Sequence, residues 1–363
     1  MIVAHHPVGV VVAVVVAHVV DVVEQTRRKE TKTMKKIIRL LSICMILTIL
    51  LGTMTVYAVD NNDIVDTSNH TYTFQEMEED IKLLTEKHPD KISVSTVGTS
   101  VDGRALYQVV LGNKNAKNAI YIQSTIHGRE WMNTWIMLEQ LELCCDNWNM
   151  IAPHGITYGE VFNNCCIYLL PMVNPDGVTI SQLGIEAINR EEIRKNLYNM
   201  PGANNPKRWK ANADGVDLNR QFSYGWNTRI DVNGPASENF NGLKAFTEPE
   251  ALAMKSAMAQ REFVAAITYH SMEGAIYWDL GQTGVLRDKV KALATHCHNI
   301  TGYKYGEVSP CKGLEYNYMN FVENTPMVCI ETGTVQCPLP YSQFNKLWKE
   351  NHMLFVALAG CYQ

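Results

Sequence analysis

The 363-residue sequence has no excess of basic residues, since 32 Lys and Arg stand against 37 Asp and Glu and the net charge at pH 7 is −5. Proteins that bind nucleic acid neutralise the phosphate backbone with clusters of Lys and Arg. We therefore expect no nucleic-acid partner.

The ten cysteines also lack any Cys-x-x-Cys pattern of the kind that binds zinc. Cys144-Cys145 and Cys165-Cys166 lie inside apolar runs, so most cysteines are expected to pack as small core residues. An exported protein can form one or two disulfides, but their pairing cannot be read from the sequence.

The apolar run from Leu40 to Leu51 is short of the roughly 20 residues that a membrane-spanning helix needs. A basic start at Met34-Lys35-Lys36 precedes it, and Val56-Tyr57-Ala58 offers small residues for signal peptidase. This layout predicts a secretory signal peptide at 34–58 that is cleaved after Ala58. The alternative is an uncleaved membrane anchor.

Residues 1–33 include a run, Val8 to Val23, of almost only Val, Ala, His and Gly. We interpret 1–33 as a start-site artefact or as a low-complexity extension. Residues 59–71 predict a polar linker, and 72–363 the folded domain. Because the leader holds seven Lys and Arg but three Asp and Glu, its removal changes the net charge from −5 to −9. The mature protein is predicted to be extracellular, either free or associated with the cell wall, without stable membrane association.

Apolar patterning along the domain predicts strands that alternate with helices, and thus a largely parallel or mixed sheet covered on both faces. A capping box at Thr73-Phe74-Gln75-Glu76 marks the first helix, Asn174-Pro175-Asp176-Gly177 is expected to be a turn, and 178–262 is rich in loops. The predicted strands are 92–97, 105–111, 119–125, 166–172, 263–269 and 327–330. The predicted helices are 73–88, 130–148 (amphipathic), 285–300 and 341–358.

Three residues with metal or acid–base chemistry directly follow predicted strands: His127, His270 and Glu331. Open α/β sheets place their ligand crevice at the carboxyl ends of strands, so we expect these side chains to meet there.

His127, Glu130 and His270 form a His₂Glu set of the type that holds catalytic zinc and leaves a fourth position for water. His127 and Glu130 are three residues apart, so one turn can aim both at a single point. Bound zinc lowers the pKa of its water to about 7, which produces a nucleophile at neutral pH.

The same reaction needs a proton carrier, and peptide recognition needs a group for the substrate's carboxylate. Glu331 is the candidate for general base and acid. Asn219 and Arg220 are candidates for binding a free terminal carboxylate, because the planar guanidinium of arginine can donate two parallel hydrogen bonds to it.

The set of motifs resembles the zinc carboxypeptidases of the carboxypeptidase A/B family over roughly 72–360. The resemblance implies a mixed, mostly parallel eight-stranded sheet flanked by helices and one Zn²⁺ per chain on His127, Glu130 and His270. It also implies Glu331 as general base and acid, Asn219 and Arg220 on the terminal carboxylate, and Arg129 on a more distant part of the substrate. The motifs are His127-x-x-Glu130, Asn174-Pro175-Asp176-Gly177, Gly215-Val216-Asp217-Leu218-Asn219-Arg220, His270-Ser271 and Glu331-Thr332-Gly333.

Two features depart from the family pattern. The arginine that stabilises the transition state in the family aligns with Lys210, and Arg208 is the alternative. The mobile tyrosine that covers substrate has only Tyr316 and Tyr318 as candidates, in a segment without a clear Asp for basic side chains. A weak preference for apolar or aromatic C-terminal residues is therefore expected.

The sequence thus predicts an exported zinc metallocarboxypeptidase that acts on peptides with a free C-terminal carboxylate. One alternative is a γ-D-glutamyl-diamino acid peptidase that acts on cell-wall muropeptides. Others are a deacylase of N-acyl amino acids and a non-catalytic zinc- or peptide-binding protein on the same fold. The oligomeric state is not predictable from the sequence.

Overall fold

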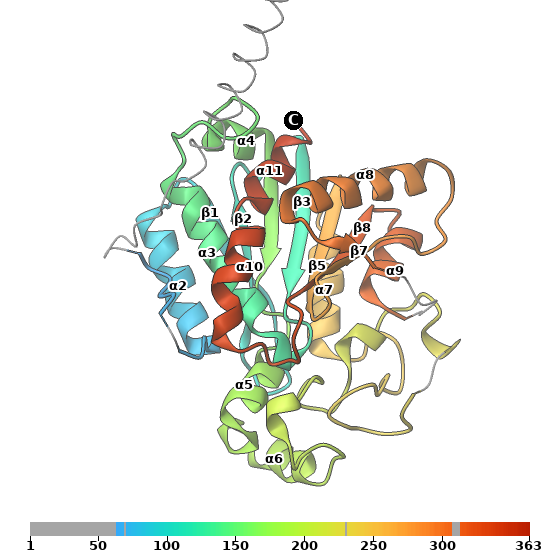
Figure 1. Cartoon of the computed structure of the whole chain (residues 1–363). Coiled ribbons are helices and arrows are strands. Elements are labelled where there is room, and N and C mark those ends of the chain that lie inside the picture. Colours follow the sequence, from blue (N-terminus) through green and yellow to red (C-terminus); the bar gives the residue numbers. More distant parts are fainter. Residues whose placement is uncertain (1–62, 69, 229–230, 307–312) are drawn as a thin grey trace, which may run out of the picture. The chain divides into compact units, whose positions relative to one another are not determined.

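The computed structural model describes residues 63–363 apart from 69, 229–230 and 307–312, and within them eight strands form one mixed sheet (Figure 1). The strand order is β1-β2-β4-β3-β5-β8-β6-β7. β4, β3, β5 and β8 run parallel to one another, as do β6 and β7, and the other three pairings are antiparallel. The strands are β1 (Ile92–Thr99), β2 (Ala105–Leu111), β3 (Asn118–Ser124), β4 (Cys165–Leu170), β5 (Ala265–Ser271), β6 (Ala275–Tyr277), β7 (Lys304–Tyr305) and β8 (Met327–Thr332).

Helices cover both faces of the sheet, and the alternation of side chains along the strands explains why (Figure 1). In β3, Ile120 and Ile122 face one hydrophobic cluster, while Ala119 and Tyr121 face another. The first cluster packs α2 (Phe74–Lys87), α3 (Met132–Asp146), α4 (Tyr158–Asn164), α8 (Gly284–Thr301), α10 (Phe344–Asn351) and α11 (Leu354–Gly360). The second packs α7 (Pro249–Met258) and α9 (Glu315–Phe321).

The predicted fold class is confirmed, and several predicted elements appear with nearly the expected bounds. At α2, Thr73 and Glu76 make both hydrogen bonds of the predicted capping box. The expected turn at Asn174 is instead the start of α5 (Pro175–Leu183), with Asn174 as its N-cap and Pro175 in its first turn.

Two helix predictions are wrong in detail. The helix expected at 130–148 was to be amphipathic, but almost all of α3 is buried because neighbouring helices cover the side that faces away from the sheet. The single helix expected at 341–358 is two helices, α10 and α11, which meet at His352 and Met353.

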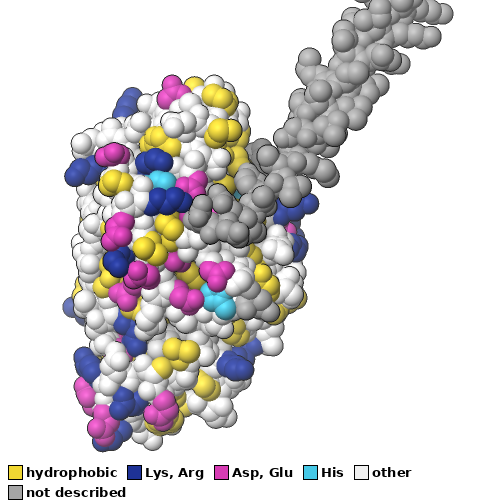
Figure 2. Space-filling view, turned by 90° about the vertical axis from the view of Figure 1, so that its left-hand side faces the viewer, with side chains coloured by type: hydrophobic (Ala, Val, Ile, Leu, Met, Phe, Trp, Pro, Cys, Tyr) yellow, Lys and Arg dark blue, Asp and Glu magenta, His cyan; other side chains and the backbone are white. Residues whose placement is uncertain are grey.

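Seven of the eight described cysteines are buried, and none of the eight forms a disulfide, as expected for core residues. On the face seen in Figure 2, acidic and basic side chains are interspersed. No helix in the described part of the chain is long and apolar enough to cross a membrane. The predicted extension 1–33, the signal peptide 34–58 and the first residues of the linker 59–71 lie outside the described residues.

Candidate active site

Three strands of the parallel part of the sheet deliver the candidate site residues to one edge. His127 follows β3 by three residues, His270 is the last residue but one of β5, and Glu331 is the last residue but one of β8. His270 and Glu331 are directly paired in the β5–β8 register. Paired residues of neighbouring parallel strands point to the same face about 4.8 Å apart, so Glu331 lies beside the metal-binding candidates.

His127, Glu130 and His270 form a buried cluster. Glu130 Oε1 lies 2.9 Å from His127 Nδ1, and Glu130 Oε2 lies 3.1 Å from His270 Nδ1. The two Nδ1 atoms are 3.1 Å apart. Neighbouring ligand atoms around a tetrahedral zinc ion with bonds of about 2.1 Å are roughly 3.4 Å apart, a few tenths of an ångström more than these separations, so this donor set fits the ion.

A carboxylate orients His127 from its other side. Asp217 Oδ1 lies 3.2 Å from His127 Nε2, which leaves Nδ1 free to face the cluster, as is usual for metal-binding histidines. Burial acts to raise the pKa of Asp217, but the charges of Lys210, Arg220 and His127 hold it well below its ordinary value. Burial and the nearby Lys210 also lower the pKa of His127, which favours the neutral imidazole that binds metal.

Close backbone contact fixes the turn that carries His127 and Glu130. This turn is a 3₁₀ helix, η1 (Gly128–Glu130), and a Cβ atom on Gly128 would lie 2.2 Å from the carbonyl carbon of Gly177 in α5. The His-Gly-x-Glu sequence therefore needs glycine at its second position for packing, because no larger residue fits against α5.

Asn174 connects the segments around the site. Its Nδ2 donates to the carbonyls of Ile126, Lys210 and Ala211 at 3.1, 3.2 and 3.0 Å, and its Oδ1 accepts from the Gly177 amide at 2.9 Å. The side chain is completely buried. Asn174 therefore joins the end of β3, the start of α5 and the segment that leads to Asp217.

The Glu331 side chain is partly exposed, and its surroundings raise its pKa towards neutral pH, which suits a group that takes up and releases a proton. Burial raises its pKa to about 7, with His270 opposing the rise and Glu130 adding to it. A hydroxyl and amide network holds the strand beneath it: Thr332 Oγ1 donates to Asn133 Oδ1 at 2.6 Å and lies 2.8 Å from Ser271 Oγ. The Thr after Glu331 and the Ser after His270 thus fix the two strand ends together.

Asn219 and Arg220 lie next to the cluster in the 3₁₀ helix η4 (Leu218–Arg220), where Asp217 accepts a hydrogen bond from the Asn219 amide. Asn219 Nδ2 is 3.3 Å from His270 Nε2, and its Oδ1 accepts from the Glu315 amide. The Arg220 side chain is buried, and its Nε has no hydrogen-bond partner among the described residues. Arg220 Nε forms an ion pair with Asp231 Oδ2 at 3.9 Å, which is too long for a hydrogen bond. A buried guanidinium with a donor that is not hydrogen-bonded is suited to bind a carboxylate ligand.

The structure brings Lys210 into the site and turns Arg208 away from it. Lys210 Nζ lies 3.2 Å from Asp217 Oδ2, whereas Arg208 donates to the carbonyl of Cys337. Arg129 pairs with Glu238 at 3.1 Å and also donates to the carbonyl of Arg208. Of the two basic candidates for transition-state stabilisation, Lys210 has the better position.

The two candidate tyrosines belong to α9. Tyr316 is buried in the second hydrophobic cluster. Tyr318 packs against Phe222 and Phe246, and its hydroxyl donates to Glu323, a residue that lines a cavity at the amino end of β3. The Tyr318 hydroxyl is therefore engaged with Glu323, and substrate contact by Tyr318 stays a prediction.

Sequence reasoning assigned no role to Asp217, Asn174 or Glu315. Asn174 and Asp217 lie inside two of the family motifs. Their contacts with Ile126 and His127 join segments that are far apart in the chain, so the sequence does not show them. Glu315 is completely buried, its Oε1 has no hydrogen-bond partner among the described residues, and burial raises its pKa to about 8. An acidic residue in a mostly apolar helix was the one available signal for it.

Comparisons with known proteins agree with this arrangement. The zinc carboxypeptidase family model matches residues 77–351, and the chain belongs to this family. It is therefore a zinc-dependent metallocarboxypeptidase, and the His127, Glu130 and His270 cluster is a group that could hold the metal ion. Asp63, Glu142 and Asp146 also lie close enough together to hold a metal ion. The Glu142 carboxylate, however, already accepts hydrogen bonds from the backbone amides of Ile64 and Val65.

Among similar sequences, γ-D-glutamyl-L-diamino acid endopeptidase 1 of Lysinibacillus sphaericus is 28% identical over 294 residues, which is 80% of this chain and 72% of that protein. Human mast cell carboxypeptidase A is 27% identical over 216 residues, which is 58% of this chain and 47% of that protein. The structure of thrombin-activatable fibrinolysis inhibitor superposes with a TM-score of 0.64 at 18% identity, over 84% of this chain and 78% of that one, which shows the shared fold.

Proposed function

We propose that the protein hydrolyses the C-terminal peptide bond of its substrates, with His127, Glu130 and His270 as zinc ligands. The observation that carries this proposal is the buried Arg220, whose Nε lacks a hydrogen-bond partner among the described residues. Its neighbour Asn219 lies 3.3 Å from His270, so a carboxylate held by Arg220 is close to the metal-binding cluster. Such a site selects substrates that end in a free carboxylate.

Glu331 acts as general base and then as general acid. If bound by His127, Glu130 and His270, zinc would acidify a water molecule and polarise the scissile carbonyl. Glu331 would accept a proton from water on its carboxylate and deliver it to the nitrogen of the leaving amino acid, so the proton is conserved over the reaction. Its position beside His270 in the β5–β8 register supports this role.

Lys210 stabilises the negative charge that develops on the carbonyl oxygen. Its ammonium group lies 3.2 Å from Asp217, the carboxylate that contacts His127, which supports this role. Arg129 reaches substrate further from the scissile bond once it leaves Glu238, with which it forms a partly exposed ion pair. Tyr316 remains a candidate substrate contact from α9.

A second candidate substrate is a cell-wall muropeptide, cut at a γ-D-glutamyl-diamino acid bond. The similarity to the Lysinibacillus sphaericus endopeptidase covers 80% of this chain, more than the 58% covered by human mast cell carboxypeptidase A. The same metal ligands and Glu331 would serve both substrates. We further propose that residues 34–58 direct export and are removed after Ala58, which places the enzyme outside the cell.

The test is digestion of a mixed library of linear peptides and muropeptides by the zinc-loaded protein, with products identified by mass spectrometry. Glu331→Gln should abolish cleavage. Glu273→Gln is the matched control, because this nearby carboxylate is exposed and has no proposed role. Loss of single C-terminal residues supports the carboxypeptidase, and cleavage of muropeptides alone supports the second candidate. Equal activity of wild-type protein and Glu331→Gln would refute the role of Glu331.

A further inference from the structure

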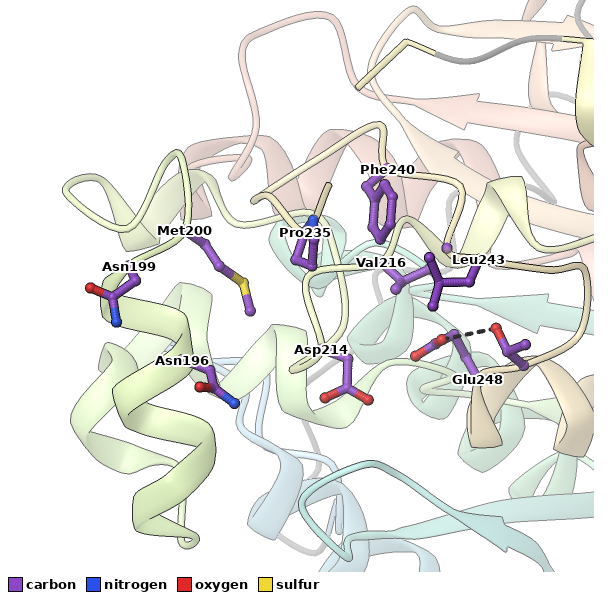
Figure 3. A pocket seen from close by; sticks show the side chains of 11 residues that line it. Asn196, Asn199, Met200, Asp214, Val216, Pro235, Phe240, Leu243 and Glu248 are labelled. Carbon is purple, nitrogen blue, oxygen red and sulfur yellow. Dashed lines mark hydrogen bonds between the residues drawn. The ribbon is translucent and has the colours of Figure 1, made fainter. Parts of the chain in front are cut away.

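A cavity of about 670 Å³ lies beside the segment that carries Asp217, and none of the metal-binding residues lines it (Figure 3). Its volume is within the range of about 300–1,000 Å³ that is usual for sites that bind small molecules. Its walls come from the end of α6 (Glu191–Tyr198) and the residues after it, from 214–216 and from 235–248. The carboxypeptidase reaction described above uses none of these side chains.

One wall of the cavity is apolar. It includes Met200, Val216, Phe240 and Leu243, and the side chains of Val216 and Phe240 are buried. Leu243, in contrast, is 90% exposed, which is unusual for a large aliphatic residue next to an apolar cavity. A ligand with an aliphatic portion would cover this surface.

Two carboxylates supply the polar part of the cavity. Asp214 lies between Asn196 and Glu248 in Figure 3, and its carboxylate accepts no hydrogen bond from the described residues. Glu248 is only 7% exposed and accepts hydrogen bonds from Asn212 at 2.7 Å and Thr247 at 3.1 Å. Burial raises the pKa of Glu248, and repulsion from Asp214 adds to the rise.

Two further acidic residues, Glu250 and Asp176, lie behind the cavity. Asn212 donates to Glu250 as well as to Glu248, and burial raises the pKa of Glu250 to about 8. Asp176 lies further back, where Arg104 already pairs with it at 2.7 Å. Arg190 acts on Asp214 from the other side, but its guanidinium pairs with Glu192 at 3.0 Å. Arg104 and Arg190 therefore have acidic partners, whereas no residue in the described part of the chain donates a hydrogen bond to the Asp214 carboxylate.

We propose that this cavity binds an amphipathic organic cation, with an ammonium or guanidinium head between Asp214 and Glu248 and an aliphatic stem against Val216, Phe240 and Leu243. The apolar walls and the volume do not suit a bare metal ion, which needs several oxygen ligands within about 2.6 Å. A free aliphatic amine and a basic side chain of a peptide share this chemistry. The proposal does not depend on what the enzyme cleaves.

The experiment is isothermal titration of the zinc-loaded, full-length protein with hexylammonium, with N-acetyl-lysine amide and with neutral hexanol. Saturable binding of one cation per chain is expected, with hexanol much weaker. Stronger binding of hexylammonium indicates a free amine as the natural ligand, and stronger binding of the lysine amide indicates a peptide side chain. The same titration of Glu331→Gln should give the same affinity, so the result is independent of the proposed catalytic function.

Asp214→Asn should weaken cation binding about fivefold to tenfold, since it removes one partly exposed charge partner. The matched control Asp288→Asn removes an exposed carboxylate on α8 and should leave the affinity unchanged. Leu243→Ser, at a position that is 90% exposed and so tolerant of substitution, should weaken hexylammonium binding severalfold. No saturable binding, equal binding of hexanol, or an affinity unchanged by Asp214→Asn would overturn the proposal.

Discussion

Gly128→Ala should damage the metal site without changing any metal-binding or catalytic side chain. The new Cβ atom would lie 2.2 Å from the carbonyl carbon and 2.3 Å from the carbonyl oxygen of Gly177, both of them backbone atoms. Carbon atoms that are not bonded prefer separations of about 3.5–4.0 Å, so η1 and the start of α5 must move apart by more than about 1 Å. This movement displaces His127 and Glu130 together.

The cost follows from the rigidity of both segments. Overpacking of this kind usually destabilises by about 1–3 kcal/mol, and we expect the upper end because no flexible side chain can give way. A loss of about 3 kcal/mol in a domain of this size lowers Tm by roughly 6–10 °C. Zinc affinity should also fall by about tenfold or more, because the ligand geometry is disturbed. Differential scanning calorimetry and competition with a zinc-binding dye measure the two effects.

Gly234→Ala is the matched control. No heavy atom lies within 4 Å of a Cβ added there, and the residue has no positive φ. Its Tm and zinc affinity should therefore equal those of the wild-type protein. If Gly128→Ala also behaved like the wild type, the close contact between η1 and α5 could not be what positions His127 and Glu130.

Further predictions concern the proposed carboxylate-binding residue Arg220, the buried side chain of Asn174 and the acidic residue Glu139. Arg220→Lys should raise KM for peptides with a free C-terminal carboxylate by roughly 10- to 100-fold, because the planar fork is lost; a similar rise for amidated peptides in steady-state assays would contradict the assignment. Asn174→Ala should lower the free energy of unfolding in urea by about 2–4 kcal/mol, since it leaves buried backbone groups without partners; a change below about 1 kcal/mol would refute this. Burial raises the pKa of Glu139 from 4.5 to about 8. Because the folded state keeps this proton to higher pH than the unfolded chain, stability falls as the pH rises from about 4.5 to 8, and Glu139→Gln should remove about one proton from that dependence. The exposed control Glu86→Gln should not, and equal pH profiles for the two variants in urea titrations would count against the buried-acid account.

The sequence predicted an element correctly where the residues that determine it are neighbours in the chain. The capping box at Thr73 and the bounds of β2 are visible in consecutive residues, and the structure confirms both. The sheet-edge argument also succeeded, because the carboxyl ends of parallel strands meet at one edge regardless of the loops between them.

Tertiary contacts decided the rest. β6 and β7 have three and two residues, which is too short for an alternating pattern of apolar and polar side chains. They form because β6 pairs with β8 and β7 pairs with β6. The contact between His127 and Asp217 spans 90 positions, so only the folded chain shows it. The cavity beside Asp214 is formed by three separate segments of a region in which the sequence predicted mainly loops.

The most direct test of the zinc site is an anomalous difference map from crystals of the zinc-loaded protein, with data collected on both sides of the zinc absorption edge. Our account predicts one peak about 2.0–2.2 Å from His127 Nδ1, His270 Nδ1 and a carboxylate oxygen of Glu130. A map without a peak at these three residues, or with zinc bound only elsewhere, would contradict the account.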